Sequence, residues 1–368
     1  MTARTAPADR ARAEARHGLH FAGLGSEAEL QALSREGGLE RRRAWLVDLD
    51  NLVLAARRAV ARGDGEVACG AALAVAELAR RAGPLGLALA LLQDAARCHG
   101  APRRDLERVR IATGAVLLEL GRAEEAGPLL EAAARACRGA GEPALEALAL
   151  QALAQFEHDR GRPDRANARI RAALALVPRG EVWLDARLRT TAGAVALYEG
   201  RFDAACEELE RARLGLRACG DRLSEARVAL NLAVAHGQRG DIAQSGDWYE
   251  EALRLLDAAG DRVGLCAALA SRAAWCDKVG RTDASRWYLE ASLTLARELG
   301  DRRGEGIAHG GRGRCAAVAD PRPHLEQALA IHRELGWDYG QVYALCGLAR
   351  LEVAAGRAAA ALALADEA

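Results

Sequence analysis

Glycines that end predicted helices recur along most of the chain at intervals of about 40 residues, the signature of stacked structural repeats. One series is Gly83, Gly121, Gly161, Gly200, Gly240 and Gly280. A second series lies between its members: Gly100, Gly141, Gly180, Gly220, Gly260, Gly300 and Gly336. Each glycine follows an amphipathic stretch of about 17 residues, as expected for a helix that ends on a left-handed residue. The repeating unit is therefore predicted to be two helices joined by tight turns.

Small and large residues occupy fixed positions within this unit. The first helix carries a small residue at Ala76, Gly114, Ala154, Gly193, Ala233, Ala273, Gly313 and Ala349. The second helix carries one at Ala88, Ala126, Ala166, Ala205, Ser245, Ser285 and Ala361, and another at Ala95, Ala133, Ala173, Ala212, Ala252 and Ser292. A large apolar residue lies between those two, at Leu92, Leu130, Ile170, Leu209, Tyr249 and Leu289. Because small residues let helix axes approach, we expect the large column to be buried between paired helices.

Helix starts are also marked in the sequence. Asp221, Asp261 and Asp301 stand where N-caps belong, and Pro163 stands at a first helical position. Aromatic residues make up only 4% of the chain, and alanine, leucine, arginine and glutamate dominate it. These features predict an all-α protein.

The columns resemble the tetratricopeptide repeat (TPR), and the resemblance covers residues 64–368. It implies a right-handed α-α superhelix, an α-solenoid of helix-turn-helix units with about seven repeats and a truncated last one. The chain departs from the family in its longer period, in lacking the frequent tryptophan and late proline, and in a unit shortened around Asp320, Pro321 and Pro323. The longer period is similar to that of the TPR arms of large bacterial regulators.

Residues 1–63 form a different, helical segment. Ser26 and Glu29 match the sequence pattern of a capping box at a helix start. Residues 46–60 are predicted to form one amphipathic helix. The stretch from Trp45 to Asp64 is similar to the junction between the nucleotide-binding module and the TPR arm of STAND-type signalling ATPases. Two alternatives follow: the chain is a fragment or split gene of a larger regulator, or it is a stand-alone repeat protein.

Charge and cysteine usage limit the class of partner and the compartment. The chain has 51 basic and 51 acidic side chains, so no net field attracts nucleic acid or an anionic membrane. Nine cysteines stand singly without CxxC spacing, which indicates reduced thiols in a cytoplasmic protein. No signal peptide or membrane-spanning run is present in the sequence.

Patterns that suggest chemistry each have a simpler explanation. The glycines between Gly304 and Gly313 follow no predicted strand, so a weakened helix is expected rather than a phosphate-binding loop. His17 and His20 lack further metal ligands nearby, and the single lysine, Lys278, belongs to no P-loop. We therefore expect no cofactor, no metal and no enzymatic activity.

Three tryptophans are candidates for ligand binding. Trp248 and Trp287 lie one or two residues before the large apolar column, which favours packing between stacked repeats over ligand stacking. Trp337 replaces the usual aspartate at a turn and is expected to be exposed.

A polar stripe in the central repeats is the candidate binding site. Gln151, Gln155 and His158 share one helix face, the face that TPR proteins turn toward their concave groove. Register-equivalent helices add Arg187, Tyr198, Arg227 and Gln238. The alternative is a solvated polar face, the default for exposed polar residues.

The predicted function is a non-catalytic scaffold that binds a protein or peptide partner of acidic character through this groove. The alternative is the ligand-sensing arm of a STAND-type ATPase or transcriptional regulator in bacterial signal transduction. That arm would pair with an upstream ATPase or kinase module and respond to a partner or a small-molecule inducer.

Overall fold

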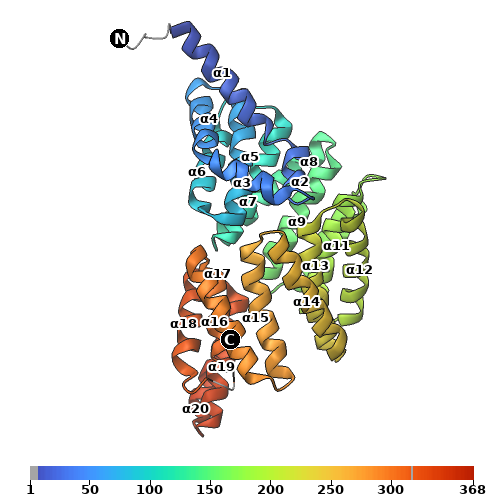
Figure 1. The fold of residues 1–368 in the computed structure, drawn as a ribbon, viewed down its shortest axis with the longest axis vertical. Helices are drawn as coiled ribbons and strands as arrows, with labels where there is room; N and C mark the ends of the chain where they lie inside the picture. Colours follow the sequence, from blue (N-terminus) through green and yellow to red (C-terminus); the bar gives the residue numbers. More distant parts are fainter. Residues whose placement is uncertain (1–6, 316–317) are drawn as a thin grey trace. The chain divides into compact units, whose positions relative to one another are not determined.

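A computed structural model describes residues 7–315 and 318–368, and this part of the chain contains twenty α-helices and no strand. The all-α fold of paired helices predicted from the repeats is confirmed (Figure 1). The first six residues of the predicted N-terminal segment lie outside the described residues.

The chain forms two compact units, Met1–Leu153 with Ala175–Gly180, and Ala154–Leu174 with Glu181–Ala368. The helices that lie in the first unit, or begin there, are α1 (Pro7–Gly23), α2 (Glu27–Ala32), α3 (Gly38–Val47), α4 (Leu49–Arg62), α5 (Gly65–Ala82), α6 (Leu85–Arg97), α7 (Arg103–Glu119), α8 (Ala123–Ala140) and α9 (Pro143–Asp159). In this unit α1 and α4 pack against α5. A domain boundary at residue 63 stays a prediction.

The second unit contains the end of α9 and the remaining helical pairs. Its helices are α10 (Pro163–Ala175), α11 (Val182–Tyr198), α12 (Phe202–Ala218), α13 (Arg222–Arg239), α14 (Ile242–Ala258), α15 (Arg262–Lys278), α16 (Thr282–Leu299), α17 (Arg302–Arg312), α18 (Arg322–Glu334), α19 (Asp338–Ala354) and α20 (Ala358–Glu367). The odd-numbered helices are the first helices of their repeats. From α11 to α19, each first helix packs on the second helix that follows it, and successive first helices also contact one another.

The predicted caps are present at both ends of the helices. Every glycine of the two series has a positive φ, for example 95° at Gly240. Residues with a Cβ rarely adopt this conformation, and most of these glycines lie one or two residues after the last residue of a helix. Gly100 and Gly180 are exceptions, because α6 already ends at Arg97 and α10 at Ala175. At the other end, the carboxylates of Asp221, Asp261 and Asp301 accept hydrogen bonds from backbone N–H groups three residues later.

The packing columns are also confirmed. Every residue of the large column is buried, and Leu209 is completely so. A Cβ built on Gly193 would lie 2.5 Å from Cγ of Leu209, so the first helix can approach only where it carries almost no side chain. Ala349, in the last full repeat, is the exception to the buried small columns because it is only half-buried.

The helix predicted for residues 46–60 is wrong as a single element. Helix α3 ends at Val47 and α4 begins at Leu49. Between them, Asp48 leaves helical geometry (φ −91°, ψ 10°), and its carboxylate accepts a 3.1 Å hydrogen bond from Nδ2 of Asn51. A short polar side chain that bonds locally competes with the continuous helix, which explains the break.

The glycine-rich stretch forms a shortened helix. Helix α17 has 11 residues, whereas α15 has 17. A Cβ at Gly311 would lie 2.4 Å from Leu289, and one at Gly313 would lie 2.3 Å from Leu325. These glycines therefore permit close packing against second helices.

Candidate functional site

Four ring-bearing residues from three first helices of the second unit lie together, and we call His158, Tyr198, Tyr339 and Tyr343 the tyrosine cluster. The ring centroids of His158 and Tyr198 are 4.0 Å apart. Tyr198 meets Tyr339 edge to face at 5.2 Å, and Tyr339 stacks on Tyr343 at 5.9 Å. The four rings therefore form a continuous chain.

The helices place these rings by simple local geometry. His158 lies in the last turn of α9, and Tyr198 is the last residue of α11, ahead of its capping glycine. Tyr339 and Tyr343 are four residues apart on α19, so they point to the same side of that helix. First helices are the ones that line the inner surface of a TPR-type superhelix.

The tyrosines remain accessible although they contact one another. Tyr198 is 53% exposed, Tyr343 49% and Tyr339 37%. Large aromatic side chains that pack only to stabilise a fold are normally buried, as the Tyr249 side chain is. The cluster therefore offers ring surface that the fold leaves available.

Two arginines stack on the aromatic rings at this place. The guanidinium of Arg303 lies 4.2 Å from the ring centroid of Trp337, and that of Arg314 lies 4.2 Å from that of Tyr343. Both distances are within the range of cation–π attraction. Arg303 also pairs with the carboxylate of Asp159 at 3.6 Å.

Charged groups join the end of α9 to the start of α19. Arg160 lies 3.9 Å from Asp338, and Nε2 of Gln155 donates a 2.8 Å hydrogen bond to the carboxylate of Asp159. The cluster is thus bordered by ion pairs at this edge.

Burial sets the protonation of the cluster. It lowers the pKa of His158 below its usual 6.5, against the opposing effect of Asp159, so the imidazole is neutral at pH 7. The side chains packed around the covered part of each ring exclude water, which raises the pKa of Tyr198 and raises that of Tyr339 to about 12. The rings are therefore uncharged at neutral pH, and the nearby arginines supply the positive charge.

The structure brings together only two of the residues proposed from the sequence, His158 and Tyr198. Arg187 stacks over Trp183, with its guanidinium 5.2 Å from the ring centroid. Gln238 is exposed at the C-terminal end of α13. Gln151 lies on the part of α9 that belongs to the first unit, whereas Gln155 lies on the part that belongs to the second.

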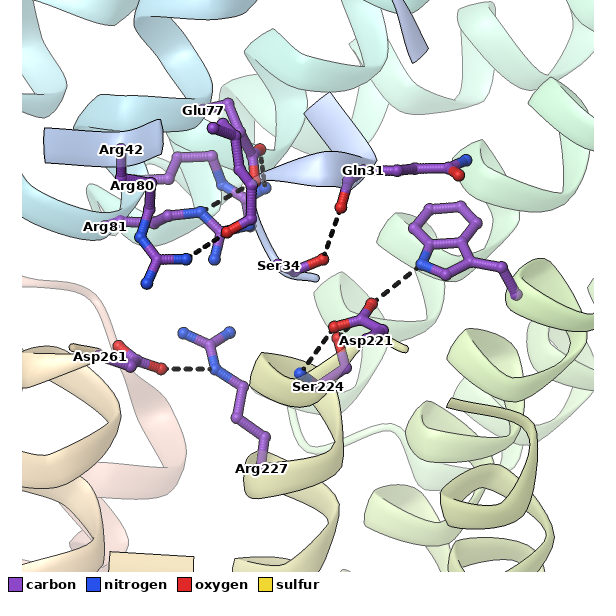
Figure 2. A network of polar contacts seen from close by, with 12 residues as sticks. Gln31, Ser34, Arg42, Glu77, Arg80, Arg81, Asp221, Ser224, Arg227 and Asp261 are labelled. Atoms are coloured by element: carbon purple, nitrogen blue, oxygen red, sulfur yellow. Dashed lines mark hydrogen bonds and ion pairs between the residues drawn. The ribbon is translucent and has the colours of Figure 1, made fainter. Parts of the chain in front are cut away.

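Arg227 binds the residue that caps the start of α15, and it does not belong to the tyrosine cluster. Its Nε donates a 3.0 Å hydrogen bond to the Asp261 carboxylate that caps α15 (Figure 2). In the preceding repeat, Asp221 binds both the backbone N–H and the hydroxyl of Ser224 (Figure 2). The indole N–H of Trp183 donates to the same Asp221 carboxylate at 3.0 Å. Polar side chains of the first helices are thus partly engaged in joining consecutive repeats.

Sequence reasoning missed Tyr339, Tyr343, Arg303 and Arg314. The available signal was the pair of tyrosines at helical spacing directly after Trp337, which replaces a capping aspartate. Trp337 was expected to be exposed, but it is half-buried because Arg303 stacks on it and the ring of His332 lies 4.8 Å away.

The other two tryptophans have different environments. Trp248 is partly buried against the core of the α11–α13 region, with Arg213 stacked over it. Trp287 is 61% exposed on α16, so the prediction that it packs between repeats is wrong. It points away from the packing column because Leu289, two residues further on, occupies the buried position.

Residues 7–315 and 318–368 contain no group of three or more metal-ligating side chains, and His17 and His20 both pack against the ring of Phe21. All nine cysteines are unpaired thiols. None of the described helices combines the length and apolar character that crossing a membrane requires.

No protein-family model matches the chain. In sequence, it is 30% identical over 228 residues to the regulatory protein AfsR of Streptomyces griseus. The match covers 60% of this chain and 22% of AfsR, so the chain spans less than a quarter of that relative.

Solved structures show the same fold at low sequence identity. A Rap protein in complex with Competence and Sporulation Factor superposes with a TM-score of 0.71, 11% identity and coverage of 97% of this chain and 96% of that one. The STAND protein PH0952 of Pyrococcus horikoshii, which has a tetratricopeptide repeat sensor, gives a TM-score of 0.52 at 14% identity, over 89% of this chain and 53% of that one. The chain has a TPR-like helical-repeat fold. It shares this fold with the Rap protein and with the STAND protein PH0952.

Proposed function

We propose that this TPR-like protein is a non-catalytic binding module that takes up a peptide or a segment of a partner protein on the tyrosine cluster. One observation carries the proposal: three contacting tyrosines stay between 37% and 53% exposed, although they come from helices distant in sequence. Tyrosine buries a large area at a small cost in side-chain entropy, and it often dominates the free energy of binding.

The composition of the cluster favours a peptide over a small apolar molecule. Neutral phenol hydroxyls and a neutral imidazole offer hydrogen bonds to backbone groups, while the rings offer apolar surface. Among structures of similar fold, a Rap conjugation gene regulator was solved in complex with the Phr* peptide (TM-score 0.64, 12% identity). That likeness agrees with peptide binding as the role of this chain.

The test uses a phage-displayed library of random seven-residue peptides selected on the full chain. Selected peptides should lose at least about tenfold in affinity for Tyr198→Ala and for Tyr339→Ala, because each change removes ring surface from the cluster. Trp287→Ala is the matched control, since it removes an exposed aromatic ring on α16 outside the cluster. Equal affinity for all three variants would place binding elsewhere, and failure to select any peptide would count against the function.

The sequence similarity to the regulatory protein AfsR and the fold likeness to the STAND protein PH0952 support a second role, that of the sensing arm of a STAND-type regulator. In this role the chain binds an ATPase module and alters its activity when the cluster is occupied. An ATPase module encoded beside this chain should co-purify with it and hydrolyse ATP at a different rate in its presence. A rate unaffected by the chain would contradict this role.

A further inference from the structure

We propose that Arg314 receives a carboxylate of the bound segment while Tyr339 and Tyr343 pack against an apolar side chain beside it. The cluster then selects peptide segments in which Asp or Glu neighbours an aromatic or aliphatic residue. This inference rests on the proposed function, and it names the chemical class of ligand.

Two other cations that border the tyrosine cluster already have acidic partners. Arg303 pairs with Asp159 at 3.6 Å, and Arg160 pairs with Asp338 at 3.9 Å. Across the described part of the chain, no carboxylate forms an ion pair with Arg314, whose neighbour is the ring of Tyr343 at 4.2 Å. Arg314 is therefore the guanidinium of the cluster that remains available to an anion.

The N–H groups of Arg314 are not engaged by the aromatic ring on which its guanidinium stacks. A guanidinium that lies over an aromatic face interacts through its plane, while its N–H groups point outward around the edge. Those groups have the fork geometry that binds a carboxylate through two parallel hydrogen bonds. Tyr343 is 49% exposed and Arg314 is half-buried, so part of the stacked pair faces solvent.

The surroundings of Arg314 make an unpaired cation costly. Burial is the largest effect and lowers the pKa of Arg314, and the charge of Arg350 acts in the same direction. The hydroxyls of Tyr343 and Tyr339 and the carboxylate of Asp277 oppose this shift, but Asp277 forms no ion pair with Arg314 among the described residues. A carboxylate from a ligand would offset part of the cost of burying this charge.

A single guanidinium favours a carboxylate over a phosphate. Phosphate groups carry nearly two negative charges and are commonly recognised by several arginines together. Of the two arginines that stack on rings here, Arg303 is already neutralised by Asp159, so Arg314 is the one whose charge is left for a ligand. A phosphorylated peptide is therefore the alternative that the experiment distinguishes.

The experiment uses peptides selected on the full chain from the random seven-residue library. Each selected peptide that contains Asp or Glu is synthesised in that form, in the corresponding amide form and, where it contains tyrosine, in the phosphotyrosine form. On the unmodified chain, the carboxylate form should bind about tenfold more tightly than the amide form, a typical effect for a charge-assisted hydrogen-bonded pair. This comparison needs no protein variant.

Two variants then assign the effect to one residue. Arg314→Gln should bind the carboxylate and amide forms about equally. Arg314→Lys should retain part of the preference for the carboxylate form, because lysine keeps the positive charge but lacks the paired N–H donors of the guanidinium. Arg286→Gln is the matched control, since Arg286 is half-exposed on α16 and pairs with Asp283. Circular dichroism and the melting temperature establish that each variant is folded.

Each result has a distinct meaning. If peptides are selected and Tyr198→Ala abolishes their binding, but carboxylate and amide forms bind equally, the role of Arg314 is refuted and the proposed function stands. Tighter binding of phosphotyrosine than of Asp or Glu peptides would also overturn the assignment. If no peptide is selected, the proposed function itself fails.

Discussion

Tyr198 and Tyr339 meet edge to face with ring centroids 5.2 Å apart and ring planes at 82°, although α11 and α19 are separated in sequence by several repeats. Neither tyrosine belongs to a packing column, and both keep part of their surface exposed. The second unit therefore contains long-range contacts that its nearest-neighbour repeat packing does not require.

Leu209→Ala should lower the free energy of unfolding by about 2 to 5 kcal/mol, because the completely buried side chain leaves a cavity between α11 and α12. Urea denaturation measures the change. Leu214→Ala on the same helix is the control: Leu214 is 60% exposed, so its loss should change stability by less than about 0.5 kcal/mol. Equal midpoints for the two variants would show that the register of this repeat is wrong.

Ala205→Leu should destabilise the protein by about 1 to 3 kcal/mol, since the helices approach each other at this completely buried position. Ala218→Leu, at the exposed end of α12, adds the same side chain without overpacking. Thermal unfolding of both variants distinguishes overpacking at position 205 from the effect of adding a leucine side chain to α12. A melting temperature for Ala205→Leu equal to that of the unmodified protein would contradict the close helix packing at this position.

The thiols should not contribute to stability through disulfides, so a reducing agent should leave the melting temperature unchanged. Burial raises the pKa of Cys69 to about 12 and that of Cys137 to about 11, which keeps both protonated and unreactive at pH 8. Iodoacetamide should therefore label the exposed Cys346 first, as mass spectrometry of the digested protein would show. Early labelling of Cys69 would argue against this core.

Stability should decrease between pH 6.5 and pH 4. Burial lowers the pKa of His309 and of His332 to about 4, whereas the unfolded chain takes up these protons near 6.5. The unfolded state therefore binds more protons in this window. For each histidine, the free energy of unfolding should decrease by about 1 to 3 kcal/mol as the pH falls from 6.5 toward 4.

The variant His332→Gln should reduce this pH dependence, whatever its stability at pH 7. Urea denaturation at pH 7 and pH 5 measures the difference for each protein. His99→Gln is the control because His99 is exposed. An unchanged difference in His332→Gln would mean that His332 titrates normally in the folded protein.

The double variant Arg187→Ala with Arg227→Ala should weaken partner binding by at least about 1 kcal/mol if these arginines also contact the ligand. Arg227 joins the cap of α15, so the melting temperature should fall slightly, but the protein should remain folded. Titration calorimetry with a library-selected peptide gives the affinity. Unaltered affinity would restrict binding to the tyrosine cluster.

The fold was predictable because its determinants are local. A capping glycine, an aspartate at a helix start and the small residue facing Leu209 each act within one repeat, so their spacing in the sequence reveals them. The candidate site was predictable only in part, since His158 and Tyr198 lie in adjacent repeats. Their contact with Tyr339 depends on how several repeats wind, and small rotations between repeats are not encoded in any single residue.

Trp337 ties the start of α19 to the two helices that precede it. Helix α19 begins at this tryptophan without a side-chain cap, whereas α13, α15 and α17 each begin at an aspartate that binds the helix's own backbone. The start of α19 is instead fixed by Arg303 of α17 and His332 of α18. We therefore expect the start of α19 to become ordered only after α17 and α18 are in place, so that folding at this end proceeds in the direction of the chain.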